Sequence, residues 1–254
     1  MRDFTIRQYI SLLDQLKQSG GTFQTVSEYA TTPAQQAIIL RHDIDDRKEH
    51  ARTFAQLQNE RGIKGTYYFR VVPESFDHEL IQEIESLGHE IGYHYEDMDF
   101  AKGNRHEAYR LFQIHLEKLR AIATIQTICM HGSPRSEYDN KDVWKDFSYR
   151  NHEIIAEPYL DFNFDVLFYL TDTGRMWDGK KFSIRDEIAT SKTWPRFHST
   201  SDIILAINNK KLPLPVMLNF HPQRWTDNRL LWTKELIFQS LKNQIKKWRK
   251  NRSK

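Results

Sequence analysis

The sequence predicts an α/β fold built from repeated strand and helix units, and three observations support this prediction. Short apolar runs alternate with longer amphipathic stretches, which is typical of βα units and not of a β-sandwich. Aromatic residues make up 13% of the 254 residues, which favours a packed core. Gly and Pro number only 10 and 8, which excludes a linker or low-complexity protein. Because no linker-like stretch divides the chain, we expect a single domain over residues 1–254.

Six apolar runs are predicted as strands and six amphipathic stretches as helices. The expected strands are 36–41, 66–70, 89–93, 127–131, 166–170 and 215–220. The expected helices are about 5–18, 46–61, 78–87, 104–121, 200–208 and 228–250. Turn residues 19–21 stop the first helix, Gly62 and Gly88 follow the second and third, and Asp77 can cap the third. The aromatic-rich and Asp/Asn-rich stretch 140–191 is predicted as long loops around one strand.

Cysteine content, hydropathy and charge exclude several classes of protein. A single cysteine excludes a disulfide scaffold and a Cys-based zinc module. No run of about 18 apolar residues occurs and charges interrupt the N-terminal apolar stretch, so we expect a cytoplasmic protein without a membrane span or signal peptide.

The net charge of +3 conceals a basic C-terminal helix, because residues 242–254 contain seven Lys or Arg and no acid. Such a segment can be a solvated helix end, where cations suit the helix dipole, or a weak attraction to an anionic membrane surface. No nucleic-acid-binding motif accompanies it, so we expect no nucleic-acid partner.

Acids and histidines follow several of the predicted strands. Asp43 and Asp45 end the first run, and strand alternation places them on one face, where two carboxylates need a cation or a shared proton. His94, His131 and His221 follow later runs in the same way. Each alone has a plainer interpretation, as a helix cap or a core histidine. Together, they are the arrangement that a catalytic edge of parallel strands requires.

The residues at these strand ends resemble a known family. Residues 40–45, the strand at 65–70 and the string Gly-His-Glu-Ile-Gly-Tyr-His at 88–94 are similar to the polysaccharide deacetylases, the NodB-homology group of carbohydrate esterases. The resemblance spans about residues 36 to 225. It implies a distorted (β/α)7-type barrel and a divalent-metal hydrolase that removes an acyl group, such as acetyl, from a sugar. Zinc is the expected metal, with iron, cobalt, nickel or manganese as alternatives.

The resemblance also implies roles for single residues. Asp43 would be the general base, Asp45 a metal ligand, His94 the first metal histidine and His221 the general acid. His131 occupies the place of the family's third motif, where an arginine usually orients the base.

One departure concerns the metal. The family's second motif supplies a further histidine four residues after the first, and here that position is Met98, whose thioether is a poor ligand for zinc. His131 is the first candidate for the third ligand, and Glu96 and Asp97 are the second. Without a third ligand, the chain would be a carbohydrate-binding relative that does not hydrolyse its sugar.

Substrate contacts are predicted from aromatic and arginine residues beside these motifs. They are Arg41, Tyr93, Arg175, Trp177, Arg224 and Trp225. Core packing is the alternative for the aromatic rings, and a structural ion pair with Asp43 is the alternative for Arg41. The expected partner is a carbohydrate: a sugar nucleotide, a lipid-linked sugar or an oligosaccharide.

Overall fold

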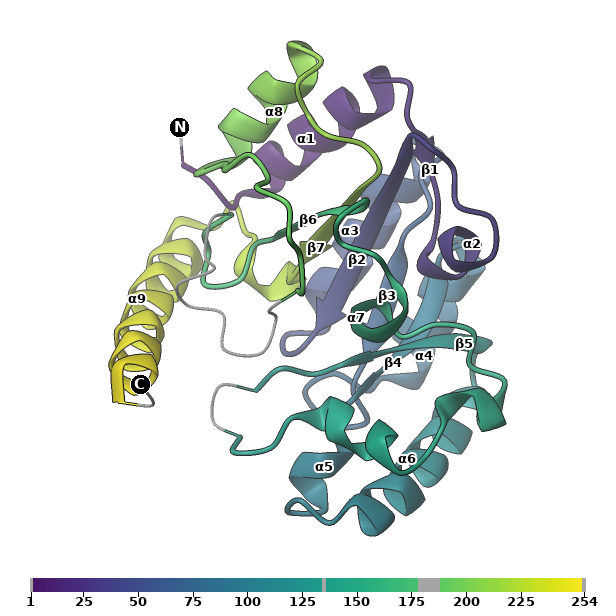
Figure 1. The fold of residues 1–254 in the computed structure, drawn as a ribbon. Coiled ribbons are helices and arrows are strands. Elements are labelled where there is room, and N and C mark those ends of the chain that lie inside the picture. Colours follow the sequence, from purple (N-terminus) through teal and green to yellow (C-terminus); the bar gives the residue numbers. More distant parts are fainter. Residues whose placement is uncertain (1, 134–135, 178–187, 253–254) are drawn as a thin grey trace.

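A parallel sheet of seven strands organises the chain (Figure 1). The computed structural model describes residues 2–133, 136–177 and 188–252, with side chains described as far as Gln244. The strands run in the order β5-β4-β3-β2-β7-β6, with β1 also beside β2, and every recorded pairing is parallel. All carboxyl ends therefore lie at one edge of the sheet.

The bounds of the elements are as follows. The strands are β1 (Thr22–Phe23), β2 (Ala37–Ile44), β3 (Thr66–Phe69), β4 (Glu90–Tyr95), β5 (Ile125–Met130), β6 (Phe168–Thr171) and β7 (Val216–Phe220). The α-helices are α1 (Ile6–Gln18), α2 (Val26–Thr31), α3 (Glu49–Asn59), α4 (His78–Ser86), α5 (Asp97–Phe100), α6 (Arg105–Arg120), α7 (Pro158–Asp161), α8 (Thr200–Asn208) and α9 (Arg229–Arg252). Short 3-10 helices span η1 (Asn140–Lys145), η2 (Tyr149–His152) and η4 (Pro222–Arg224).

The two faces of the sheet have different surroundings because side chains alternate along each strand. On the outer face, residues such as Leu40 and Ile44 share one hydrophobic cluster with the buried sides of α1, α3, α4, α6 and α8. On the inner face, residues such as Ile39, Tyr68 and Met217 form a second, smaller cluster. Figure 1 shows α1 beside α8 at one end of the sheet and α5 beside α6 at the other.

The segment after η2 runs beside β5, along the side of that strand that does not pair with β4. Ala156 forms an isolated parallel bridge with Thr127, and its carbonyl accepts a hydrogen bond from the Ile128 backbone N–H at 3.1 Å. Farther along, the Tyr159 and Tyr169 hydroxyls lie 3.1 Å apart. The segment that connects β5 to β6 in the sequence therefore covers part of the inner face.

The predicted elements are confirmed, with shifts at their ends. β2 extends to Ile44 instead of residue 41, so Asp43 lies within the strand. Its side chain and that of His42 take opposite faces, as alternation predicts: His42 lies 3.3 Å from the Tyr9 hydroxyl of α1. The stretch 140–177 contains short helices that the sequence did not predict, because four to six residues are too few to show a helical period. Residues 178–187 of the predicted loop region lie outside the described residues.

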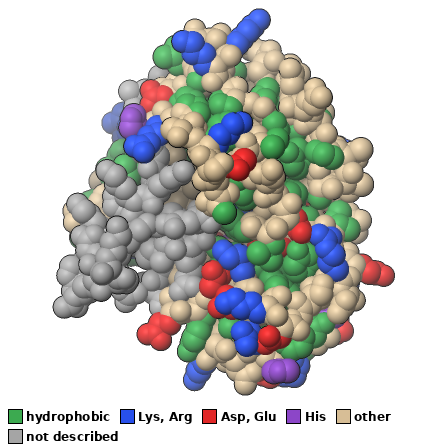
Figure 2. Space-filling model, in the orientation of Figure 1, with side chains coloured by type: hydrophobic (Ala, Val, Ile, Leu, Met, Phe, Trp, Pro, Cys, Tyr) green, Lys and Arg blue, Asp and Glu red, His purple; other side chains and the backbone are tan. Residues whose placement is uncertain are grey.

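The described part of the chain has no helix that is both long enough and apolar enough to cross a membrane. In the space-filling view of Figure 2, acidic and basic side chains lie interspersed on the visible face. The basic side chains after Lys242 lie outside the described side chains, so the predicted charge of that helix end is known from sequence alone.

Close packing on the inner face makes Gly92 of β4 intolerant of a side chain. A Cβ atom at this position would lie 2.3 Å from Cε1 of Tyr68. We predict that Gly92→Ala lowers the free energy of unfolding by about 1–3 kcal/mol, the usual cost of overpacking, measured by urea denaturation. Combining it with Tyr68→Leu, which removes the obstructing ring, should cost less than the sum of the single changes. Strict additivity would contradict this explanation.

Candidate metal centre

The carboxyl edge of the sheet gathers the acids and histidines that the sequence singled out. Asp43 lies in β2 and Asp45 directly follows it, while His94 lies in β4. His131 and His221 directly follow β5 and β7. These positions fall on the inner side of their strands, so their side chains meet although they are up to 178 positions apart in the sequence.

Three of these residues form a group with the spacing of metal ligands. Oδ1 of Asp45 lies 3.4 Å from Nε2 of His94 and 3.7 Å from Nε2 of His131. One ligand atom from each of the three lies within 4.8 Å of the other two. A divalent ion between them is compatible with this geometry, and carboxylate and imidazole are ligands that zinc accepts.

His221 and Asp43 border the same space. Nε2 of His221 lies 3.7 Å from Oδ2 of Asp45 and 4.0 Å from Oδ2 of Asp43. Oδ2 of Asp43 is also 3.9 Å from Nε2 of His94. Two carboxylates and three imidazole Nε2 atoms therefore face one small volume.

A hydrogen bond at Nδ1 orients each imidazole ring, while Nε2 faces the site. Nδ1 of His94 donates to the Cys129 carbonyl at 2.9 Å, that of His131 to Glu96 at 2.9 Å, and that of His221 to Asp172 at 2.6 Å. A carbonyl only accepts, so Nδ1 of His94 carries a proton, and Nε2 is the nitrogen that can offer a lone pair to a metal ion. This is the usual support of a metal-binding histidine.

Arginines neutralise the supporting acids. Arg70 forms a bidentate pair with Glu96, with both bonds at 2.8 Å, and Arg224 Nη1 contacts Asp172 at 2.9 Å. Burial by itself would raise the pKa of Glu96 and of Asp172. The neighbouring imidazoles and arginines outweigh burial and lower both pKa values, so both acids remain ionised. For His131, burial by itself would lower the pKa. Its hydrogen bond to Glu96 and the nearby charge of Asp45 outweigh burial, so the pKa of His131 is raised.

Asp43 has its own arginine. Arg41 donates to both Asp43 oxygens, at 2.8 and 2.7 Å, and Asn219 Nδ2 donates to Oδ2 at 2.9 Å. Burial favours the protonated acid, yet Arg41 and the two imidazoles prevail and lower the pKa of Asp43 to about 2. The ion pair considered for Arg41 is thus present, and it holds Asp43 ionised and fixed in orientation.

Asp45 differs from the other acids at this edge. Within the described residues, its carboxylate has no arginine partner, and Oδ1 is buried without a hydrogen-bond donor. Burial raises its pKa, but the surrounding imidazoles together lower it well below its usual range. A buried anion is unfavourable unless positive charge lies beside it, whether protons on these imidazoles or a bound cation. The residues present therefore fit a bound divalent cation.

The alternative ligands predicted from the sequence are engaged elsewhere. Oε2 of Glu96 binds His131 and Arg70, and Oε1 binds Arg70. Both oxygens of Asp97 accept from the Tyr93 hydroxyl, and Oδ1 also lies 2.7 Å from His115 Nδ1. Met98 is buried in the outer cluster. Of the three candidates for the third ligand, only His131 lies within ligand distance of Asp45 and His94.

Several predicted substrate contacts lie in the interior, and packing accounts for their positions. Tyr93 belongs to the outer cluster, and Trp177 packs against Phe220 and Trp225. Arg175 covers the ring of Trp232, with its guanidinium 4.6 Å from the ring centroid. With Trp177 4% exposed and Trp225 fully buried, neither ring offers a face to a sugar. Arg224 contacts His221 and Asp172 and therefore positions the site from behind.

Sequence reasoning missed Asp172, which supports His221. It lies one residue after β6, and it accepts from the His221 backbone N–H at 3.0 Å and from the Trp225 indole at 2.6 Å. An acid following a strand was the signal that identified Asp43 and Asp45, and it applies here too. The loop-rich surroundings of β6 in the sequence obscured it.

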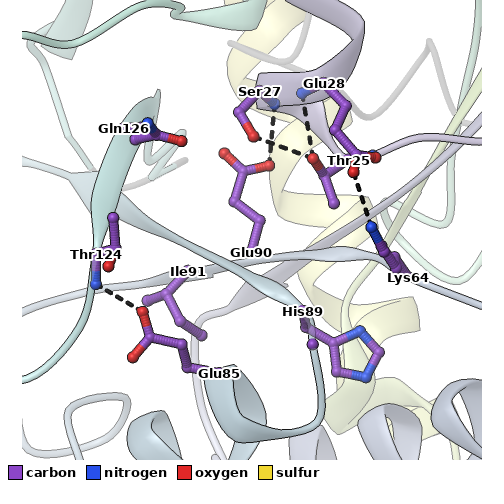
Figure 3. Close-up of a pocket in the computed structure, with 11 residues that line it drawn as sticks. Thr25, Ser27, Glu28, Lys64, Glu85, His89, Glu90, Ile91, Thr124 and Gln126 are labelled. Carbon is purple, nitrogen blue, oxygen red and sulfur yellow. Dashed lines mark hydrogen bonds and ion pairs between the residues drawn. The ribbon is translucent and has the colours of Figure 1, made fainter.

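The opposite edge of the sheet has a hollow that is not part of this centre (Figure 3). It has a volume of about 300 Å³ and includes Glu90 at the start of β4. Glu90 accepts hydrogen bonds from Ser27, Thr66 and Thr127, and Lys64 pairs with Glu28. Glu90 is satisfied by uncharged donors and Lys64 by Glu28, so these groups do not call for a ligand.

Comparison with known proteins identifies no family for this chain. No protein-family model matches the chain, and no curated protein matches it.

We predict that the purified protein binds one Zn²⁺ and that His94→Ala or His131→Ala weakens binding by more than the 10–100-fold typical of losing an outer-shell partner. The physical reason is the loss of one of three converging ligands. Isothermal titration calorimetry measures the affinity, and His78→Ala, which removes an exposed histidine far from the site in sequence, is the matched control. Equal affinity in the His131 and His78 variants would exclude His131 as a ligand.

The pH dependence of zinc binding is a second test. Because the pKa of His131 is raised, a proton competes with the metal below that pKa, and affinity should fall by up to about tenfold per pH unit as pH decreases. Glu96→Gln removes the charge that raises this pKa, so its affinity should begin to fall at a lower pH than that of the wild type. Coincident profiles from titrations at several pH values would contradict the assignment.

Proposed function

We propose that this protein is a metal-dependent hydrolase that removes an acyl group, in the first instance acetyl, from an amino sugar or glycan intermediate. The observation that carries the proposal is the convergence of Asp43, Asp45, His94, His131 and His221 on one volume, with each imidazole supported from behind. A site for metal binding alone does not need a further acid and a further imidazole beside the three ligands.

Asp45, His94 and His131 would hold the ion. A divalent metal bound there supplies Lewis-acid chemistry, which polarises an acyl carbonyl and makes water more acidic.

Asp43 and His221 would move the protons. Arg41 keeps Asp43 ionised and aimed at the site, so Asp43 is ready to accept a proton from an attacking water. His221 has Nδ1 bound to ionised Asp172, which orients the ring so that Nε2 would donate a proton to the departing nitrogen or oxygen. Such opposite protonation states produce a bell-shaped dependence of rate on pH.

The departure from the resembled family has a physical interpretation. That family takes two histidines from its second motif and an arginine from its third. Here, the third-motif position is His131, and the arginine beside the base is Arg41, within the same strand as Asp43. The third ligand would thus come from the end of β5 instead of the second motif, and the arginine from β2, so Met98 would not abolish the metal site.

We also infer that the sheet is curved into a distorted (β/α) barrel. Oδ1 of Asp45, after β2, lies 3.4 Å from Nε2 of His94 in β4 although β3 separates these strands, and such a close approach favours a curved sheet. The segment at 154–159, which lies between the end strands β5 and β6, would complete the enclosure.

We predict that the zinc-loaded protein releases acetate from at least one N-acetylated sugar in a panel of oligosaccharides and nucleotide-linked sugars. Asp43→Asn should lower kcat by about 10²–10⁴-fold, the usual contribution of a general base, while zinc affinity stays within a few-fold of wild type. Quantifying the released acetate measures the rate.

Asp46→Asn is the matched control, because this exposed carboxylate lies three positions from Asp43 and its Oδ1 accepts from the neighbouring Arg47 backbone N–H. It should leave kcat unchanged. A rate unaffected by Asp43→Asn would overturn the assigned base. Sugar binding by the zinc-loaded wild type without acetate release from any member of the panel would favour the carbohydrate-binding alternative.

A further inference from the structure

Helix α9 has its polar and apolar faces reversed relative to an ordinary surface helix. Glu235, Gln239 and Asn243 recur every four residues and are buried, so they form the stripe that faces the body. Leu230, Ile237 and Leu241 lie on the opposite side of the helix at 100° per residue, and they are 82%, 56% and 60% exposed. Phe238 lies next to this stripe and is 47% exposed.

Polar contacts hold α9 in this orientation. Glu235 pairs with Arg47 at 3.2 Å, Asn243 donates to the Gly174 carbonyl at 3.0 Å, and the Trp232 carbonyl accepts from Arg175 at 2.9 Å. Arg47 and Gly174 lie in the loops that follow β2 and β6, so α9 is attached at the carboxyl edge of the sheet. Figure 1 shows it at the periphery of the molecule. Rotating the helix to bury the apolar stripe would break these contacts.

The charge around the apolar stripe is of one sign. Lys234 lies among its residues, Lys242 lies 4.1 Å from the Phe238 ring centroid, and from residue 236 to the C-terminus the sequence has no acid. The only acid within α9, Glu235, is on the buried side and paired. An exposed apolar stripe flanked by lysines is the pattern of a helix that lies in the surface of an anionic bilayer.

A second copy of the chain is the other occupant to consider. Pairing two α9 helices through the stripe would place lysines and arginines opposite lysines and arginines, because no exposed acid is available on either helix. Like charges across an interface are unfavourable, whereas anionic headgroups neutralise them.

We propose that the outer face of α9 binds the surface of a membrane that contains anionic lipids, with Leu230, Ile237, Phe238 and Leu241 entering the headgroup boundary and the flanking lysines pairing with headgroups. This inference depends on α9 alone and not on the proposed hydrolase activity.

Vesicle co-sedimentation of the full chain tests the proposal. We expect binding to vesicles of phosphatidylcholine with about one third phosphatidylglycerol, weakened as salt rises, and little binding to phosphatidylcholine alone. The double variant Ile237→Ser/Leu241→Ser should bind at least about tenfold more weakly, because two apolar side chains no longer enter the bilayer. Both positions are exposed, so circular dichroism should show an unchanged fold.

Leu205→Ser is the matched control, since Leu205 of α8 is also 60% exposed but lies outside the stripe. Its binding should equal that of the wild type. Failure of the wild type to bind the anionic vesicles, or equal loss in both variants, would overturn the proposal. A dimer in light scattering that the double variant converts to a monomer, without vesicle binding, would identify a second copy as the occupant.

Discussion

The carboxyl edge of the sheet depends on one electrostatic constraint: four buried or half-buried acids must remain ionised within a small volume. Three of them have an arginine each, in the pairs Asp43–Arg41, Glu96–Arg70 and Asp172–Arg224. Only the fourth, Asp45, has no arginine on its carboxylate among the described residues, and it faces three imidazole nitrogens instead. The unpaired charge is thus located where a divalent cation would be held, and the arginines keep the remaining acids available as supports.

The alternation of the parallel strands brings these groups together. Asp43, His94 and Asn219 lie within strands and point to the inner face. Their immediate neighbours in each strand point to the outer face and pack against the helices. His42 shows the separation clearly: it neighbours Asp43 but belongs to a buried network with Tyr9 and Gln58, where burial lowers its pKa to about 3 and keeps it neutral. Adjacent residues therefore serve the fold and the site independently.

The two proposals depend on different surfaces at the same edge of the sheet. The metal centre uses inward-facing groups supported by arginine, whereas α9 uses polar groups to dock and leaves its apolar side outward. A membrane-bound α9 would bring this edge near lipid headgroups, which is compatible with a lipid-linked sugar among the candidate substrates. The two features can fail separately, because the substitutions that test α9 change none of the candidate ligands.

The sequence by itself determined the α/β class and the order of its main strands and helices. It also identified Asp43, Asp45, His94, His131 and His221 as side chains at the carboxyl ends of strands. Apolar period and strand-end position are local signals, so they can be read without coordinates. Only the tertiary structure decided which of His131, Glu96 and Asp97 lies beside Asp45, that Asp172 supports His221, and that Trp177 and Trp225 pack inside. Those outcomes depend on which side chains meet across strands distant in the sequence, and on the competition between burial and pairing for each charge. The outward apolar face of α9 was likewise decided by its contacts with Arg47 and Gly174, which no local pattern encodes.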